Sequence, residues 1–382
     1  MRTIYFDYNA TTPLDPEVGA AMQPYFAAEW GNPSSIHHVG RRARALLDEM
    51  RDRAAALFGS KPSEVVFTSG GTESNNLAIF GTARRLRTRG RHLITSAIEH
   101  HAVLNCFEYL ARQEGFEVTV LPVDREGRVS PENLRRTLRP DTILVSIMAA
   151  NNEVGTLQPI AELGSICRER GVIFHTDAAQ WFGKEPFTNI HQFNADLVTV
   201  CAHKFHGPKG AGALFIRSPL LPDPIIFGGG HENERRAGTE NLPAIAGLVR
   251  AMELFLRQPV FPTEPLRIMT QQLAQTIQLI EGVTLVGSPA QRLANTVAFV
   301  VNGTDSFALL AGLDVEGICA SAGAACSAGS LEPSHVVSAL GFDAQLARSL
   351  VRFSLGRENT NDEIEAVARL LPAIVRRAQS GR

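Results

Sequence analysis

The sequence is poor in the features that mark secreted and membrane proteins. No uncharged run is long enough to cross a bilayer, and the start, Met1 to Tyr8, lacks the apolar core of a signal peptide. The few cysteines are odd in number and widely scattered, which argues against a disulfide framework and fits a reducing compartment. They are Cys106, Cys167, Cys201, Cys319 and Cys326. We therefore expect a cytoplasmic protein, in which one cysteine is free to be reactive.

The chain also lacks an excess of charge. Its 37 basic and 39 acidic residues leave a net charge of −2, and the pI is about 6.6. No overall field therefore favours nucleic acid or an anionic membrane. The one basic cluster, Arg84 to Arg91, is typical of a solvated helix end, where cations complement the helix dipole. We expect neither membrane association nor direct nucleic-acid binding.

Two common ligand signatures are missing. Neither the G-x-x-x-x-G-K-[ST] pattern of a P-loop nor the G-x-G-x-x-G pattern occurs, so nucleotide binding is disfavoured. The histidine pairs, His100 with His101 and His203 with His206, have no cysteine or carboxylate at convincing ligand spacing. We predict no metal site.

What the chain does have is a regular alternation of β-rich runs and amphipathic stretches from about Glu64 onward. This pattern predicts an α/β fold with a mainly parallel sheet between helices. A proline-bearing break at 258–262 precedes a long helical pattern. We place a domain boundary there, with a large domain at 16–257 and a smaller α/β domain formed by 1–15 and 258–382. The expected strands of the large domain are 65–67, 92–95, 118–121, 143–147, 172–174, 197–200 and 210–216.

An aspartate and a lysine follow two consecutive expected strands. Asp177 ends the run from Val172, and Lys204 comes 27 residues later (204 − 177) after the next run. A lysine can form a Schiff base with pyridoxal phosphate (PLP), and a carboxylate at a neighbouring strand end can keep the pyridine nitrogen protonated. Alone, each residue is more simply a loop charge or a helix cap. Together, at the strand ends where open α/β sheets bind ligands, they predict a PLP enzyme.

The segment Thr68 to Asn76 follows one expected strand and opens a helical pattern. Its Ser69-Gly70-Gly71-Thr72 turn offers backbone N–H groups and the positive end of a helix dipole to a phosphate. An ordinary helix capped by Thr72 explains the segment equally well.

Three further polar residues are candidates at this sheet edge. His100 can lie on a flat heteroaromatic ring or move protons near it, or it can cap a helix. Asn151 can contact a cofactor or a substrate carboxylate, or form a turn. Arg352 lies in an apolar, strand-like run, where burial requires an anionic partner. That partner is either a substrate carboxylate or a structural salt bridge.

Residues 320–330 consist of Ala, Ser and Gly with the single Cys326. Such a run has little side-chain mass to anchor it, which favours a mobile loop that carries a thiol. Close packing of a small buried cysteine is the alternative. We interpret Cys106, Cys167 and Cys319, which have apolar neighbours, as structural.

These motifs, in their joint order from about Tyr5 to Arg357, closely resemble the NifS/IscS-type cysteine desulfurases of the class V aminotransferase family. The matching segments are Thr68–Asn76, Glu99–His100, Asn151–Glu153, Asp177–Gln180, His203–Lys204, Gly228–Glu232, Ala237–Thr239, Cys326 with Ser330–Ser334, and Arg352–Arg357. The resemblance implies a fold-type-I PLP transferase with a seven-stranded sheet, acting as a homodimer. It also implies removal of sulfur from L-cysteine to give L-alanine and a persulfide on Cys326.

The resemblance further assigns roles to individual residues. Lys204 would hold PLP as a Schiff base, Asp177 would pair with the ring nitrogen, His100 would stack on the ring, and Gln180 would contact the ring oxygen. Gly71, Thr72, Cys201 and His203 would surround the phosphate, joined by Thr239 of a second subunit. Asn151 would contact cofactor and substrate, and Arg352 would bind the substrate.

Two departures from the family pattern bear on function. Cys201 stands where these enzymes commonly have a phosphate-binding serine, so that contact is lost, weakened or replaced by a poorer S–H donor. The stretch after Arg357 is short, whereas in IscS-type members a longer extension helps dock the iron–sulfur scaffold protein. The acceptor is therefore open between iron–sulfur cluster assembly, tRNA thiolation and DNA phosphorothioation. The same motifs are compatible with a class V aminotransferase or a selenocysteine lyase, and with a non-catalytic scaffold for sulfur-acceptor proteins.

Overall fold

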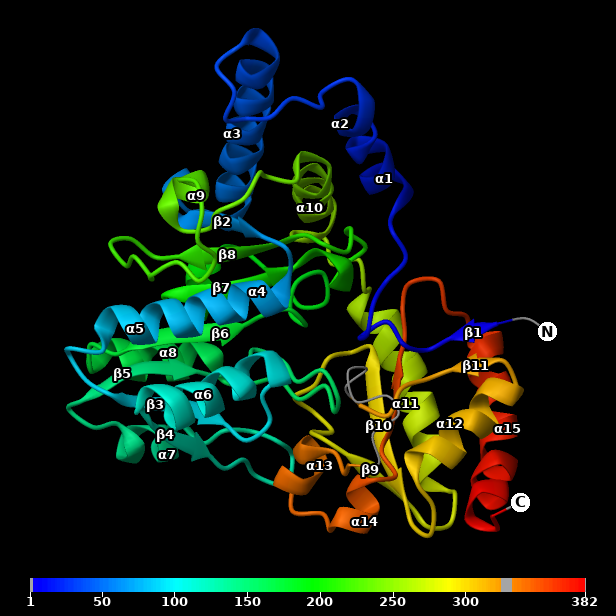
Figure 1. The fold of residues 1–382 in the computed structure, drawn as a ribbon. Coiled ribbons are helices and arrows are strands. Elements are labelled where there is room, and N and C mark those ends of the chain that lie inside the picture. The colour runs from blue at the N-terminus through cyan, green and yellow to red at the C-terminus, as the bar shows by residue number, and fades with distance from the viewer. Residues whose placement is uncertain (1–2, 324–331, 382) are drawn as a thin grey trace.

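A seven-stranded sheet in the order β2-β8-β7-β6-β5-β3-β4 forms the centre of the computed structural model, which describes residues 3–323 and 332–381 (Figure 1). Strands β3 to β7 run parallel, whereas β8 is antiparallel to both of its neighbours. The predicted α/β fold with a mainly parallel seven-stranded sheet is thus confirmed. The strands are β2 (Val65–Thr68), β3 (His92–Ser96), β4 (Glu117–Leu121), β5 (Thr142–Ser146), β6 (Ile173–Asp177), β7 (Leu197–Cys201) and β8 (Gly212–Ile216).

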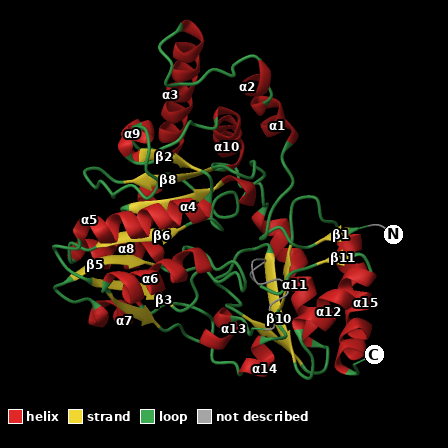
Figure 2. Cartoon of the chain, in the orientation of Figure 1, coloured by secondary structure: helices red, strands yellow, loops and turns green. Residues whose placement is uncertain are grey.

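Successive side chains of strands such as β7 enter different apolar clusters, because strand residues point alternately to opposite faces. On β7, Leu197 packs into a cluster with Leu77 and Ala78, whereas Val198 packs into the main core. Both faces are therefore covered, as the near-continuous apolar strands of a parallel sheet require. Figure 2 shows these strands framed by helices.

Five helices of this part of the chain fall between strands β2 and β6, as the pattern from Glu64 onward predicted, whereas three precede β2 and two follow β8. In chain order the helices are α1 (Pro16–Met22), α2 (Pro24–Ala27), α3 (His38–Phe58), α4 (Gly71–Asn76), α5 (Thr82–Leu86), α6 (His101–Glu114), α7 (Pro131–Thr137), α8 (Ile160–Glu169), α9 (His231–Glu234) and α10 (Leu242–Phe255). The basic cluster begins in the last turn of α5, which contains Arg84 and Arg85. Its prediction as a helix end was correct.

Two smaller sheets lie beside the central one. The first is antiparallel, in the order β12-β10-β9, and the second is the parallel pair β1-β11. Their strands are β1 (Ile4–Tyr5), β9 (Val283–Val286), β10 (Thr296–Val301), β11 (Ile318–Cys319) and β12 (Val351–Ser354), and the accompanying helices are α11 (Thr263–Gln278), α12 (Ser306–Val315), α13 (His335–Ala339), α14 (Ala344–Ala347) and α15 (Asn361–Gln379). Because β1 pairs with β11, we propose to keep segment 1–15 with 258–382 as one domain and 16–257 as the other.

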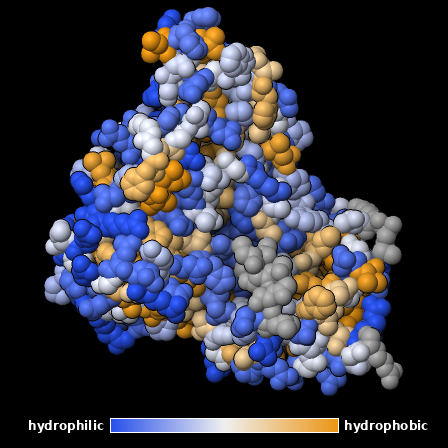
Figure 3. Space-filling model, in the orientation of Figure 1, coloured by the Kyte–Doolittle hydropathy of each residue, from blue (hydrophilic) through white to orange (hydrophobic). Residues whose placement is uncertain are grey.

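The surface is mainly polar, with separate apolar areas (Figure 3). Helix α2 and the segment that joins it to α3 expose large apolar side chains: Phe26 is 62% exposed, Trp30 68% and Ile36 89%. Within the described residues, no helix is both long and apolar enough to span a bilayer.

The short α9 contains backbone strain that can be measured. Glu232, Asn233 and Glu234 have φ values of 49°, 55° and 64°, in the left-handed region that disfavours residues with a Cβ. Glu234 is exposed. We predict that Glu234→Gly stabilises the protein by about 1 kcal/mol, since glycine adopts this conformation without steric cost. Denaturant unfolding measures the change.

The matched control is Glu132→Gly in α7, an exposed position at which glycine should instead destabilise by about 1 kcal/mol. Equal losses of stability in both variants would contradict the interpretation of α9 as strained.

Candidate active site

The parallel pairing of β6 and β7 brings the predicted aspartate and lysine to one edge of the sheet. Asp177 is the last residue of β6 and pairs with Thr199 of β7, and Lys204 lies in a short 3-10 turn directly after β7. A cavity of about 410 Å³ opens at this edge. The predicted site residues that line it are Gly71, Thr72, His100, Asp177, Gln180, Cys201, His203, Lys204 and Arg352.

The side chain of Lys204 is partly buried, and its amine is held by backbone carbonyls. Its Nζ donates to the carbonyl oxygens of Asn9, at 2.8 Å, and Ala10, at 2.7 Å. Burial lowers the pKa of Lys204, because an ammonium loses hydration there that two neutral carbonyls replace only partly. The uncharged amine, which is the nucleophilic form, is thus favoured relative to a solvated lysine.

The carboxylate of Asp177 is fixed on both oxygens. Oδ1 accepts from the backbone N–H of Ala179 at 2.9 Å, and Oδ2 accepts from Nδ2 of Asn75 at 2.7 Å. These two hydrogen bonds hold the carboxylate in one orientation. Asn75 lies on α4 and lines the cavity, and it was missed in the sequence because only the fold brings residues 75 and 177 together.

A helix N-terminus faces the cavity at the predicted phosphate segment. Helix α4 continues without interruption through a π-helical turn, Leu77–Gly81, into α5. The N-cap is Gly70, with a φ of 149°, and no side chain caps this end. The alternative in which Thr72 caps the helix is therefore wrong. Backbone N–H groups at the start of α4 are not capped by a side chain and can meet an anion.

Two residues after β7 lie on the same side of the cavity. A Cβ built on Gly71 would lie 3.8 Å from Sγ of Cys201, so this thiol faces the start of α4. His203 contacts Thr11 through Nδ1 at 3.1 Å, and burial lowers the pKa of its imidazole to about 4. His203 is thus neutral at physiological pH and can donate one hydrogen bond.

His100 is the N-cap of α6 and lines the cavity as well. Its Nδ1 accepts from the backbone N–H of Ala102 at 3.0 Å, so the neutral ring carries its proton on Nε2. Burial lowers the pKa of His100, which keeps the ring uncharged. The capping alternative is thus present in the structure, and it leaves the ring available to the cavity.

Arg352 on β12 is 1% exposed and forms the structural salt bridge that was one of its two predicted roles. Its Nη2 meets Asp7 at 2.5 Å, and Nη1 donates to the carbonyl oxygens of Asn152 and Gly323, each at 2.7 Å. Nε has no partner among the described residues. The charge is thus balanced by Asp7.

Among the described residues, two predicted site residues, Asn151 and Thr239, do not line this cavity. The amide of Asn151 holds its own turn: Oδ1 accepts from the N–H groups of Glu153 and Val154, and Nδ2 donates to Ile98. Its contact with substrate stays a prediction. Thr239 is exposed, and its role in the site of a second copy stays a prediction too. Cys326 lies outside the described residues.

Asn9 is the main site residue that sequence reasoning missed. It is 1% exposed, its carbonyl accepts from Lys204, and its side chain meets Lys184, Asn295 and Thr296. The available signal was a polar Asn-Ala-Thr-Thr segment directly after the apolar run that contains Phe6 and Tyr8. That pattern identifies a buried turn, but not its partners.

Glu99, the residue that precedes His100 in the sequence, is a buried acid. Its Oε1 contacts Ser96 Oγ at 2.5 Å and accepts from the N–H of Met148 at 3.0 Å, whereas Oε2 has no described partner. Burial raises the pKa of Glu99 to about 8. The group is therefore mostly protonated at neutral pH and adds little negative charge beside Asp177.

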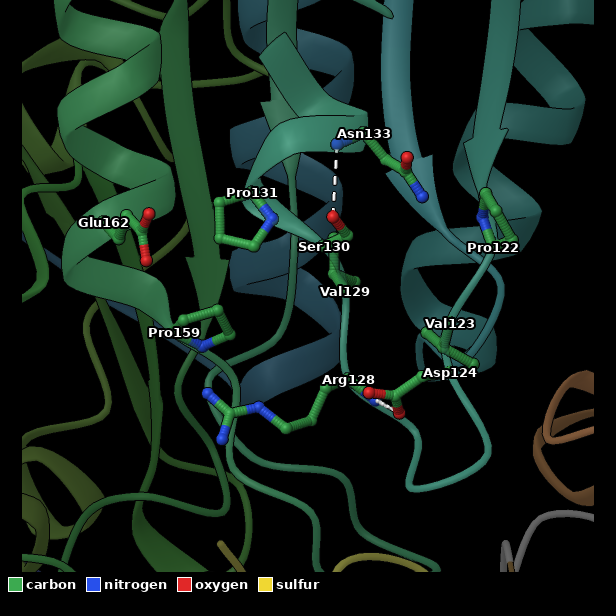
Figure 4. A pocket seen from close by; sticks show the side chains of 10 residues that line it. All are labelled: Pro122, Val123, Asp124, Arg128, Val129, Ser130, Pro131, Asn133, Pro159 and Glu162. Carbon is green, nitrogen blue, oxygen red and sulfur yellow. Dashed lines mark hydrogen bonds between the residues drawn. The ribbon is translucent and has the colours of Figure 1, made fainter. Parts of the chain in front are cut away.

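A second cavity, of about 370 Å³, lies between the end of β4 and the starts of α7 and α8 (Figure 4). No predicted site residue lines it. Asp124 caps its own turn and Ser130 caps α7, so these polar groups maintain local structure. Among the described residues, no cluster of His, Cys, Asp and Glu could hold a metal ion. The Asp177–Lys204 cavity is the candidate active site.

Comparison with known proteins agrees with this geometry. The model of the family "Aminotransferase class-V" matches residues 4–367. This chain belongs to the class-V aminotransferase family.

Within that family, the protein is similar to curated and solved relatives over nearly its whole length. It is 46% identical to the cysteine desulfurase IscS of Dictyoglomus turgidum, over 99% of this chain and 96% of that protein. A solved NifS-like protein superposes with a TM-score of 0.90 at 35% identity, covering 98% of this chain and 100% of that one. A structure described as SspA in complex with cysteine gives a TM-score of 0.80 at 36% identity, covering 94% and 100%.

The protonated state of Glu99 predicts a measurable pH dependence in this class-V protein. The pKa of Glu99 is raised to about 8 in the folded state, whereas it is about 4.3 in the unfolded state. The contribution of protonated Glu99 to the free energy of unfolding is therefore fully present below about pH 4.3 and is lost as pH rises through about 8. We predict that Glu99→Gln removes a slope of up to roughly 1.4 kcal/mol per pH unit in this window. Denaturant unfolding between pH 5 and pH 8 tests this.

The matched control is Glu132→Gln, an exposed glutamate that should leave the slope unchanged. An unaltered pH profile in Glu99→Gln would mean that Glu99 is ionised in the folded protein.

Proposed function

We propose that this protein is a PLP-dependent cysteine desulfurase, which removes sulfur from L-cysteine to leave L-alanine and carries the sulfur as a persulfide on Cys326. The observation that carries the proposal is the pairing of the Lys204 amine and the Asp177 carboxylate on one cavity. The similarity to IscS and NifS-like proteins supports the same reaction.

The residues of the cavity fit PLP. Lys204 provides an amine for the aldehyde, and Asp177 provides a fixed carboxylate for the ring nitrogen. The uncapped start of α4, with Thr72 and His203, suits a phosphate. When bound, PLP supplies an electron sink for the charge that develops on the substrate Cα.

The side chains around the cavity have protonation states that suit this chemistry. Lys204 has a lowered pKa, so its free amine can accept a proton from the substrate Cα. His100 is neutral and carries a proton on Nε2 near the same space. Closely spaced donors and acceptors of this kind contribute general acid–base catalysis without a further ion.

Arg352 is the candidate for the substrate carboxylate. Nε is the one nitrogen of its guanidinium without a described partner, and the residue lines the cavity. A carboxylate that reaches this group would gain a charge-assisted hydrogen bond while Asp7 continues to balance Nη2. The bound amino acid would then present its sulfur at the open side of the cavity.

Sulfur transfer requires a thiolate from the protein. The Cys326 thiolate would attack the sulfur of the bound cysteine, so that an S–S bond forms while the carbon–sulfur bond breaks. The electron pair of the broken bond stays with carbon, which a proton then completes to alanine. The persulfide on Cys326 would pass to a sulfur-acceptor protein such as an iron–sulfur scaffold, with tRNA thiolation and DNA phosphorothioation as alternative destinations.

A homodimer is part of the proposal. Phe26, Trp30 and Ile36 are exposed apolar side chains close together in the sequence, which a second copy would cover. An ion pair between Glu73 and Arg236, at 2.8 Å, fixes the segment before Thr239 to the start of α4. Thr239 is exposed and available to a neighbouring copy.

The test is to incubate the purified protein with cysteine, quantify alanine and sulfide, and look by mass spectrometry for one added sulfur on the Cys326 peptide. We predict that Cys326→Ala retains the visible absorbance of PLP but loses alanine and sulfide formation by at least about a hundredfold, because the nucleophile is gone. Cys319→Ala, a cysteine outside the cavity, is the matched control.

Two results would overturn the proposal. Unchanged turnover in Cys326→Ala would favour a class V aminotransferase or a selenocysteine lyase. Protein that takes up no PLP, and shows no pyridoxyl group on Lys204 after borohydride reduction, would favour a non-catalytic scaffold.

Cys201 predicts a weakened phosphate site. A thiol is a poorer hydrogen-bond donor than a hydroxyl, and burial raises the pKa of Cys201, so the group stays protonated. We predict that Cys201→Ser lowers the Kd for PLP about fivefold, as one neutral hydrogen bond of about 1 kcal/mol is gained. Absorbance titration of the apoprotein measures this, with Cys319→Ser as the control.

A weaker or equal affinity in Cys201→Ser would mean that the thiol does not face the phosphate of the bound cofactor.

A further inference from the structure

Lys184 is a buried lysine with no role in the proposed reaction. The chain has 33 arginines and only four lysines, and Lys184 is 2% exposed. Among the residues that the structure describes, no carboxylate lies within ion-pair distance of its amine. Burying a cation without a carboxylate is costly, so the amine must gain from other contacts.

Three groups surround the amine of Lys184. Nζ donates to Oδ1 of Asn9 at 2.7 Å and to Oε1 of Gln180 in a short hydrogen bond. It also lies 5.2 Å from the centre of the Phe261 ring, over the π face. These groups match the three N–H bonds of an ammonium. The lysine thereby joins the N-terminal segment, the loop after β6 and the chain before α11.

The contact with Lys184 determines which atom of the Gln180 amide can donate or accept a hydrogen bond in the cavity. Because Lys184 can only donate, the amide oxygen must face it. The nitrogen of Gln180 then donates one hydrogen to the carbonyl of Asn9, at 2.9 Å. One N–H of Gln180 is left, and Gln180 lines the cavity.

Asn9, the other hydrogen-bond partner of Lys184, depends less on the lysine than Gln180 does. Oδ1 of Asn9 also accepts from Asn295 at 3.1 Å, and Nδ2 of Asn9 donates to Thr296 at 2.9 Å. Oε1 of Gln180 has Lys184 as its one hydrogen-bond donor among the described residues. Loss of the lysine would therefore release Gln180 more than Asn9.

We propose that Lys184 is a positioning residue for the cofactor: it anchors and polarises the Gln180 amide, so that the remaining N–H is held ready for the ring oxygen of PLP. The inference rests on the proposed function and extends it to a second lysine of the same site. A donor polarised by a neighbouring cation makes a stronger hydrogen bond, and an anchored donor loses less freedom on binding.

The first test is a double-mutant cycle on the affinity for PLP. The Kd of each variant is measured by titrating the apoprotein with PLP and recording the absorbance. Lys184→Met is expected to raise the Kd about tenfold, as is Gln180→Leu, because each removes the same charge-assisted donor to the ring. The double variant should also lose about tenfold rather than a hundredfold, since the two residues act as one unit. Lys61→Met, at an exposed lysine, should leave the Kd unchanged.

The second test separates positioning from general support of the fold. 3-Deoxypyridoxal phosphate lacks the ring oxygen, so wild type and Lys184→Met should bind it with equal Kd. If the Met variant does not fold, Lys184→Gln replaces it, because its side-chain amide can still donate a hydrogen bond. This variant should show a smaller loss of affinity for PLP and no loss of affinity for the deoxy analogue.

Additive losses in the cycle, or an equal loss of affinity for both ligands, would overturn the positioning role while leaving the proposed function intact. Wild-type protein that binds neither ligand would instead overturn the proposed function and this inference together.

Discussion

The parallel alignment of β6 with β7 is the constraint on which the site depends. Because the two strands run in the same direction, their carboxyl ends meet at one edge, and Asp177 and Lys204 emerge side by side although 27 residues separate them (204 − 177). The buried inner strands cannot shift by one residue without exchanging the apolar clusters on the two faces of the sheet. Core packing therefore fixes the positions of the acid and the amine.

A second requirement is met by the N-terminal segment. Asn9 and Ala10 supply the carbonyls that hold Lys204, and the side chain of Asn9 is itself held by Lys184, Asn295 and Thr296. Residues from the start, middle and end of the chain thus share one buried polar network. Since each buried polar group must find a partner, such a network favours a single arrangement of these segments.

Two effects limit the net charge around the cavity: ion pairs neutralise some groups, and burial favours the uncharged form of others. Arg352 has a carboxylate, Asp7, whereas Lys184 and Lys204 are held by amide and carbonyl oxygens and have lowered pKa values. On the acid side, Glu99 is kept largely protonated and Asp177 receives two N–H donors. The two carboxyl groups, Glu99 and Asp177, thus have different environments. Active sites commonly separate the roles of similar groups in this way.

The sequence by itself determined the α/β class, the strands of the central sheet and the set of motifs around Asp177, Lys204 and the start of α4. These are encoded locally, in apolar runs, helix signals and turn residues, and local patterns are readable without a fold. Only the tertiary structure decided that Asn75 holds Asp177, that Asp7 neutralises Arg352, that Asn151 is used by its own turn, and that Lys184 anchors Gln180 beside Asn9. Apart from the local turn of Asn151, most of these contacts join residues that are far apart in the chain, such as Asn9 and Lys184 at a separation of 175. Hydrogen bonds depend on direction and on distances near 3 Å, and for such pairs both are set by the packing of the whole chain.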